Sequence, residues 1–220
     1  MSERKDGSMK IFQGSDLNLE NRRVFFEKNG ISESEVVSAE IAQGNQVEIV
    51  RDASAKIILG ADGLATQSED VFLAVTVADC IPVYFFDPTK GIIAIAHCGW
   101  KGIVSGVVEN SILKMAELGT EAKDVQVAIG PGLFACHFEI KEDILERFKK
   151  YEEFIIKKEG KIFVDLKGSI KKQLTGLQVK IGNIEESEEC TFEGEKFFSY
   201  RRDKPQRIEA MVAVIGMKKN

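Results

Sequence analysis

Two reactive side chains lie in the most apolar part of the sequence, residues 72–101. Cys80 follows one run of apolar residues, and His97 ends the next run along the chain. A thiolate and an imidazole are donors that zinc prefers, and the same pair can act as nucleophile and base in a cysteine hydrolase. The chain has only 2 histidines, so this placement favours a functional site over a buried thiol beside a hydrogen-bonded core histidine.

Acidic, glycine and aromatic residues surround this pair in the sequence. Asp79 provides a nearby carboxylate, and glycines at 99, 102 and 106 precede a predicted helix. Glycines allow close approach to the backbone, and the N–H groups at the start of a helix can bind an anion. Trp100 is the only tryptophan, and we expect it to stack on a planar ligand or to cover the core.

A second glycine-rich turn, residues 130–132, is followed by further polar side chains. Cys136 and His137 come after the turn, with Glu139 close behind them. One interpretation is a second wall of the site, with Cys136 or His137 close to a metal. The other is a structural turn with a histidine on the surface.

Three arginines lie within a short stretch near the end of an otherwise acidic chain, at 201, 202 and 207. Arginine is suited to bidentate contacts with phosphate or carboxylate. Residues 195–200 read as a strand, and adjacent residues on extended backbone point to opposite faces. We therefore expect one of Arg201 and Arg202 to be structural, and the alternative for the whole group is a solvated basic edge.

The predicted elements that position these groups mix strands and helices without a regular strand–helix–strand rhythm. This mixture favours an α+β fold over a doubly wound parallel sheet. Residues 71–78 and 81–86 are predicted as two strands or as one strand bent at Asp79-Cys80. The other predicted strands cover 35–41, 46–50, 92–97, 125–129, 195–200 and 210–217. The predicted helices cover 21–28, 107–118, 141–150 and 165–174, the last with Asp165 as its N-cap.

Length and composition limit the class of protein. The 220 residues predict one domain over 10–220 after a disordered start at 1–9. The net charge of −5 argues against a general nucleic-acid or anionic-membrane binder. The first residues lack an apolar signal core, and no apolar run reaches the roughly 18 residues of a membrane span. The 4 cysteines lack CxxC spacing, so we expect reduced thiols and a cytoplasmic protein; the oligomeric state is not indicated.

Taken together, the segments resemble the laccase-domain family, also called multicopper polyphenol oxidase or YfiH-like proteins. They occur in family order across most of the chain, and the ADC-x-P and H-x-GW-[RK]-G pair is specific. The matching segments are AEIAQGNQV (39–47), ADGLAT (61–66), AVTVADCIPVYFFDP (74–88), AIAHCGWKG (94–102), IGPGLFACHFEI (129–140) and FFSYRRD (197–203).

The resemblance implies a single α+β domain of stacked mixed sheets with flanking helices, as in the catalytic domain of the cytotoxic necrotising factor toxins. It implies one metal ion, zinc or alternatively copper, bound by a histidine, by Cys80 and by His97 as second histidine. It also implies phosphorolysis of adenosine, inosine or methylthioadenosine, and deamination of adenosine. Two histidines are too few for a multicopper cluster.

One position departs from the family pattern. Gln43 occupies the place of the first histidine ligand, and a neutral amide is a much poorer zinc ligand than imidazole. We expect reduced metal affinity. The outcomes left open are weak binding through the other two ligands and water, replacement by His137, Glu40 or Cys136, and impaired or altered chemistry.

For the phosphorylase reaction, the resemblance implies a purine nucleoside and phosphate as the small-molecule partners. The candidate residues are Trp100 or Phe138 near the base, Arg201 or Arg202 for phosphate, Asn45 as a further substrate contact, and Asp79 and Glu139 as acids that protonate the leaving base.

The same residues are compatible with three other functions. A metal-free cysteine amidohydrolase would use Cys80 as nucleophile and His97 as base, and it would not need the histidine that Gln43 replaces. A non-enzymatic, metal-dependent interaction protein would have lost catalysis at Gln43. Polyphenol oxidation would require copper at the cysteine–histidine pair.

Overall fold

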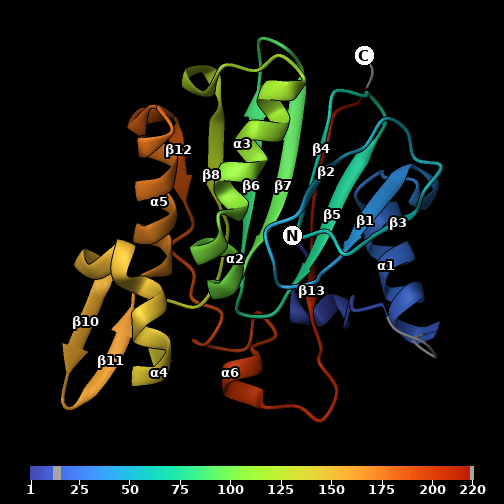
Figure 1. The fold of residues 1–220 in the computed structure, drawn as a ribbon. Helices are drawn as coiled ribbons and strands as arrows, with labels where there is room; N and C mark the ends of the chain where they lie inside the picture. The colour runs from blue at the N-terminus through green and yellow to red at the C-terminus, as the bar shows by residue number, and fades with distance from the viewer. Residues whose placement is uncertain (12–15, 219–220) are drawn as a thin grey trace.

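Two large β-sheets pack face to face, with helices on both outer sides (Figure 1). This computed structural model describes residues 1–11 and 16–218. The layers run from α1 through a four-stranded sheet and a six-stranded sheet to α2, α3 and α5. The arrangement confirms the predicted α+β class of stacked mixed sheets with flanking helices. No helix within the described ranges is both long and apolar enough to cross a membrane.

The four-stranded sheet is buried on both faces because its residues alternate between two cores. Val37, Leu73 and Val75 point toward the six-stranded sheet, whereas the neighbouring Phe72 and Ala74 pack under α1 (Asp16–Lys28). Strands that are buried on both faces appear in a sequence as continuous runs of apolar residues. Across the sheet the order is β13 (Met211–Gly216), β5 (Phe72–Val77), β1 (Val36–Glu40) and β3 (Ile57–Leu59).

The six-stranded sheet has the β6–β7 hairpin at its centre. All 7 residues of β7 are buried, because the other sheet covers one face and helices cover the other. The order is β12 (Ile184–Glu186), β8 (Gln126–Ile129), β6 (Ile81–Asp87), β7 (Ile92–Cys98), β4 (Gly63–Thr66) and β2 (Val47–Ile49). The covering helices are α2 (Trp100–Ser105), α3 (Val107–Glu117) and α5 (Leu166–Gly176).

The remaining elements are short. Asp165 caps α5 as predicted, because its Oδ1 accepts a hydrogen bond from the Gly168 N–H at 2.9 Å. A small antiparallel sheet consists of β10 (Ile155–Lys158), β11 (Lys161–Val164) and β9 (Glu139–Ile140). The other helices are α4 (Glu142–Leu145), α6 (Tyr200–Asp203) and the 3-10 turns η1 (Arg4–Asp6), η2 (Glu33–Glu35), η3 (Ala122–Asp124), η4 (Glu146–Phe154) and η5 (Ile181–Asn183).

Two predicted elements are wrong. The strand predicted over 195–200 is irregular and leads into α6, because Ser199 Oγ accepts the Arg202 N–H at 3.1 Å and starts a helix. Phe197 and Phe198 are both buried, as strand residues of these sheets are, but the segment belongs to none of the three sheets. The helix predicted over 141–150 is limited to α4, followed by the kinked 3-10 segment η4.

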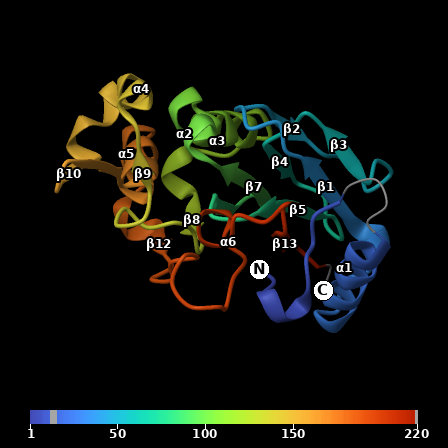
Figure 2. The ribbon, with the colours of Figure 1, turned by 90° about the horizontal axis from the view of Figure 1, so that it is seen from below.

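The first nine residues, for which the sequence predicts disorder, lie against the four-stranded sheet in the structure. The Ser2 N–H donates to the Val212 carbonyl at 2.9 Å, and the Met9 N–H donates to the Ala210 carbonyl at 2.8 Å. Met9 is fully buried in the core under α1. Nearby, α6 lies at one end of the two large sheets (Figure 1, Figure 2), where the candidate site is found.

Candidate functional site

The turn that carries Asp79 and Cys80 connects the two large sheets. β5 belongs to one sheet and β6 to the other. The residues on either side of the turn therefore form two separate strands rather than one bent strand. Asp79 has a φ of 76°, in the left-handed region that aspartate tolerates better than most residues. β6 then runs antiparallel to β7 with Pro82 opposite His97. The register places Cys80 beside the end of β7, as the sequence predicts.

Cys80 and His97 border the same small space. A Cβ added at Gly99 would lie 3.1 Å from the Cys80 sulfur and 3.9 Å from His97 Nε2. Any side chain at position 99 would therefore occupy the space that these two donor atoms adjoin. His97 is 6% exposed, whereas Cys80 is half-buried. The absence of a Cβ at position 99 leaves room for an atom that both donors can contact.

Asp62 lies behind the histidine and was not singled out from the sequence. Its carboxylate is fully buried, and its Oδ1 lies 3.6 Å from His97 Nδ1. Each oxygen accepts a backbone N–H at 2.8 Å, from Gln43 and Gly44 respectively. A carboxylate behind an imidazole orients the ring in metal sites and in catalytic triads. The signal that could have revealed Asp62 is an acidic residue within the apolar ADGLAT segment.

The charges around His97 favour its protonated form in the absence of a metal. Burial opposes a charged imidazolium, but the Cys80 thiolate and the Asp62 carboxylate outweigh burial and raise the pKa of His97 to about 9. Its Nδ1 has no hydrogen-bond partner within the described residues. Burial raises the pKa of the neighbouring Cys98 thiol, so Cys98 remains a neutral thiol.

A cavity of about 470 Å³ opens over the cysteine–histidine pair. Its size is within the roughly 300–1,000 Å³ of small-molecule sites, and its walls are mostly apolar. Gln43 reaches it from a turn with a φ of 60°. The cavity brings together these residues expected from the sequence: Gln43, Asp79, Cys80, His97, Trp100, Phe138, Glu139 and Arg201.

Only one of the two adjacent arginines belongs to this cavity. The Arg201 N–H donates to Asp79 Oδ2 at 2.6 Å, and its guanidinium donates to the Glu139 carbonyl at 3.0 Å. The same guanidinium lies 5.6 Å from the centre of the Phe138 ring. Arg202 instead forms an ion pair with Asp203 at 2.7 Å and donates to several carbonyls of the loop at 191–197. Arg202 is therefore the structural member of the pair.

Substituting each arginine with alanine should separate binding from stability. We expect Arg201→Ala to weaken binding of inorganic phosphate to the cavity by about 10–100-fold, since one charge-assisted contact contributes about 1.5–3 kcal/mol. We expect Arg202→Ala to destabilise the fold by about 2 kcal/mol through unpaired loop carbonyls, with little change in phosphate binding. Phosphate titration by calorimetry and urea unfolding of both variants test this division. Equal phosphate affinities in the two variants would contradict it.

Three candidate polar groups have contacts that limit their role. Both oxygens of Asp79 accept hydrogen bonds, one from the Thr191 hydroxyl at 2.7 Å and one from the Arg201 N–H. The Glu139 carboxylate is more exposed and lies 3.2 Å from Lys161 Nζ. The Asn45 side chain donates to the Ser105 carbonyl at 2.6 Å and is not among the cavity walls. Asn45 thus connects its loop to α2 instead of facing the cavity.

The second wall of the cavity comes from residues 138–140. Cys136 and His137, one of which would lie close to a metal in the first interpretation of the sequence, are not among the wall residues, and neither is Glu40. The Cys136 sulfur lies 3.1 Å from His137 Nδ1 on the other side of the same turn. The replacement of the first histidine by one of these residues is therefore not supported by the cavity.

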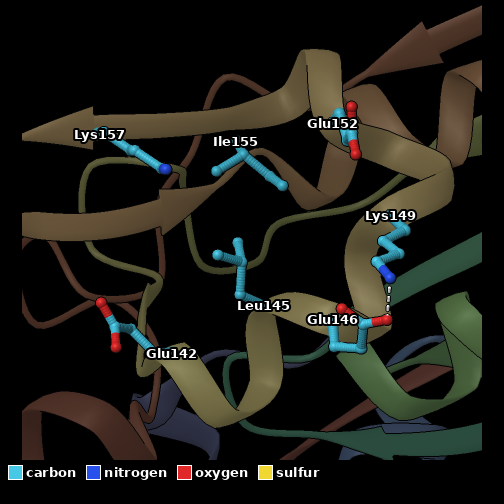
Figure 3. A pocket seen from close by; sticks show the side chains of 7 residues that line it. All are labelled: Glu142, Leu145, Glu146, Lys149, Glu152, Ile155 and Lys157. Atoms are coloured by element: carbon cyan, nitrogen blue, oxygen red, sulfur yellow. Dashed lines mark ion pairs between the residues drawn. The ribbon is translucent and has the colours of Figure 1, made fainter.

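Another hollow lies beside α4 and η4 (Figure 3). Its side chains are mostly charged, and Glu146 forms an ion pair with Lys149 at its edge. None of its wall residues offers a thiol or an imidazole, so it lacks the chemistry of the first cavity. The residues that line it are Glu142, Leu145, Glu146, Lys149, Glu152, Ile155 and Lys157.

The chain is similar to several known proteins. A purine nucleoside phosphorylase of Deinococcus radiodurans is 35% identical over 181 residues, which cover 81% of this chain and 70% of that protein. Adenosine deaminase RL5, from an unknown prokaryotic organism, is 31% identical over 150 residues, or 65% of this chain and 57% of that protein. The crystal structure of YlmD from Geobacillus stearothermophilus superposes with a TM-score of 0.89 at 28% identity, over 96% of this chain and 85% of that chain. Residues 15–218 match the family described as multi-copper polyphenol oxidoreductase laccase, so the chain belongs to this family.

Proposed function

We propose that the protein is a purine nucleoside phosphorylase whose active site is the cavity over Cys80 and His97. The observation that carries the proposal is the convergence of a thiol–imidazole pair, one arginine and aromatic walls on one cavity of about 470 Å³. Relatives named purine nucleoside phosphorylase, at 35% and 30% identity, support the same reaction class.

The donor set fits a zinc ion. Cys80 Sγ and His97 Nε2 adjoin the space that Gly99 leaves open, and Asp62 lies behind the other ring nitrogen as in many metal sites. Zinc would act there as a Lewis acid and would lower the pKa of a bound water. Gln43 lines the same cavity as the third, weaker donor.

In the proposed reaction, the chain positions phosphate against the nucleoside. Arg201 holds the phosphate, and Trp100 and Phe138 provide aromatic surfaces for the base. A phosphate oxygen bonds to the anomeric carbon of the ribose while the bond from that carbon to the purine nitrogen breaks. The electron pair of that bond goes to the purine, which takes up a proton, so the products are the free base and ribose 1-phosphate.

Glu139 and Asp79 are the proposed acids for this proton. Because both oxygens of Asp79 accept hydrogen bonds, its main role in the proposal is to hold Arg201. Glu139 is on the cavity wall with its carboxylate near solvent. It is therefore the first acid to test, by comparing Glu139→Gln with the wild-type enzyme across pH.

The deciding experiment is incubation of purified protein with adenosine, with and without phosphate, and separation of the products by chromatography. Adenine and ribose 1-phosphate formed only with phosphate would support phosphorolysis. Inosine in both samples would support deamination, the activity in the name of the RL5 relative. The absence of every product with adenosine, inosine and methylthioadenosine would overturn the proposal.

A cysteine hydrolase is the second candidate, favoured by one observation. Cys80, His97 and Asp62 are arranged as nucleophile, base and orienting carboxylate. Chelation and alkylation distinguish the two functions. A hydrolase would keep its amidase activity in a chelator and lose it when Cys80 is alkylated, whereas a zinc-dependent phosphorylase would lose activity in both treatments.

Restoring a histidine at position 43 should strengthen metal binding. We expect Gln43→His to raise zinc affinity by at least about tenfold, because imidazole is a far better zinc ligand than an amide. Histidine is also tolerated in the left-handed backbone conformation of this turn. Competition with a fluorescent zinc chelator measures the change. Gln46→His, on the same loop but not among the cavity walls, is the control, and an equal gain in that variant would contradict the prediction.

A further inference from the structure

A second group of metal-binding side chains lies outside the proposed nucleoside cavity. Cys136, His137 and Glu193 each offer a donor atom, and these atoms all lie within 4.8 Å of one another. They come from two segments, the turn after β8 and the loop before α6. None of the three is among the walls of the nucleoside cavity, so this group is separate from the Cys80–His97 site.

The distances within the group are close to those of a zinc site. His137 Nδ1 lies 3.1 Å from the Cys136 sulfur and 3.8 Å from Glu193 Oε1. The sulfur of Cys190 lies 3.7 Å from the same nitrogen. With Zn–N near 2.0 Å and Zn–S near 2.3 Å, a tetrahedral site separates its nitrogen and sulfur ligands by about 3.5 Å. Thiolate, imidazole and carboxylate are also the three ligand types that zinc uses.

Packing fixes the central histidine of this group. The His137 ring stacks on Phe192, with 4.3 Å between ring centres and an angle of 19° between planes. Its backbone N–H donates to the Phe134 carbonyl at 2.9 Å. Because the ring is restrained on one face and through its backbone, Nδ1 is held toward Cys136 and Glu193 before any metal arrives. A preorganised ligand loses less entropy on binding.

The loop that carries Glu193 is also held against the turn that carries His137. Cys190 pairs with Gly132 as an isolated bridge, and the Thr191 N–H donates to the Gly132 carbonyl at 3.1 Å. The Phe134 N–H points at the Cys190 sulfur at 3.4 Å, and such hydrogen bonds orient and stabilise sulfur ligands. The two segments therefore meet at fixed positions although more than fifty residues separate them in the sequence.

We propose that Cys136, His137 and Glu193 bind a second divalent metal ion of the zinc class, with the Cys190 thiol beside it. The ion would connect the turn after β8 to the loop that precedes α6. Through Thr191, which donates to Asp79, this loop also supports the wall of the nucleoside cavity. The proposal does not depend on the reaction catalysed in that cavity.

The test is a zinc count on the full-length protein, stripped with a chelator, reloaded with Zn²⁺ and passed over a desalting column. We expect the wild-type chain to retain one zinc ion more than Cys136→Ser, whatever the occupancy of the Cys80–His97 site. Circular dichroism of both proteins confirms that they are folded. An equal zinc content in the two folded proteins would overturn the proposal and leave the Cys136–His137 contact as a hydrogen bond alone.

Cobalt provides a second measurement that isolates this site. In a Cys80→Ser background, titration with Co²⁺ should give a thiolate-to-cobalt absorption band at one equivalent, and the band should disappear when Cys136→Ser is added. Glu193→Gln should weaken binding by at least about tenfold. Glu189→Gln, on the same loop but paired with Lys196, is the matched control and should bind normally. A band that persists without Cys136, or equal effects of the two glutamate substitutions, would refute the assignment.

Discussion

Replacing Cys80 with alanine is expected to lower kcat/KM for nucleoside phosphorolysis by at least about 10³-fold, more than the roughly 10–100-fold typical of residues behind a metal ligand. The thiol is one of two strong donors at the cavity, and its charge contributes to the raised pKa of His97. Its removal eliminates the metal site in the phosphorylase proposal and the nucleophile in the hydrolase alternative. Steady-state kinetics with adenosine and phosphate measure the effect.

Cys98→Ala is the matched control for this substitution. Cys98 is the neighbour of His97 on β7, but it is fully buried and packs in the core beneath the helices. Alanine leaves only a small cavity there, so we expect a cost of about 1 kcal/mol in stability and nearly unchanged kcat/KM. Turnover that survives Cys80→Ala would move the chemistry away from this site altogether.

Asp62→Asn should produce the second large loss of zinc affinity and activity, because Asp62 contacts both His97 and the loop at Gln43. An amide cannot accept both backbone N–H groups that the carboxylate now accepts, so one buried donor loses its partner at a cost of about 1–3 kcal/mol. The substitution also removes the negative charge beside His97 Nδ1. We expect zinc affinity and kcat/KM each to fall by about 10–100-fold.

Asp87→Asn separates this local effect from general destabilisation. Asp87 is as buried as Asp62 and also accepts two backbone N–H groups, but it lies at the opposite end of β6 from Cys80. We expect normal zinc affinity in that variant, with a modest loss of thermal stability. If both variants bind zinc like the wild type, Asp62 does not position His97.

Many strands of the two large sheets could be predicted because each one is marked by neighbouring residues in the sequence. The apolar runs that become β5 and β7 are continuous in the sequence, and burial on both faces is their cause. The sequence did not indicate that β5 and β6 belong to different sheets, since periodicity reports burial and not pairing partners. The irregular segment before α6 was mistaken for a strand because two adjacent buried phenylalanines resemble one.

Some residues of the candidate site could likewise be predicted from the sequence, whereas others could not. Cys80 and His97 could be paired from the sequence because both lie where apolar runs end. Asp62 was missed because its role depends on backbone N–H groups nineteen and eighteen positions earlier in the chain. Only the structure separates Arg201 from Arg202, because the carbonyls that bind Arg202 belong to a loop without regular structure.

The two hydrogen bonds of the Asp79 carboxylate have a consequence for synthesis of the chain. They reach residues 112 and 122 positions further on, and contacts across such separations form late because closing long loops costs entropy. During translation, Cys80 and His97 leave the ribosome well before Thr191 and Arg201. A nascent chain therefore carries the reactive thiol before the wall that closes over it has been synthesised, and the thiol of Cys80 is more accessible in that chain than in the folded protein.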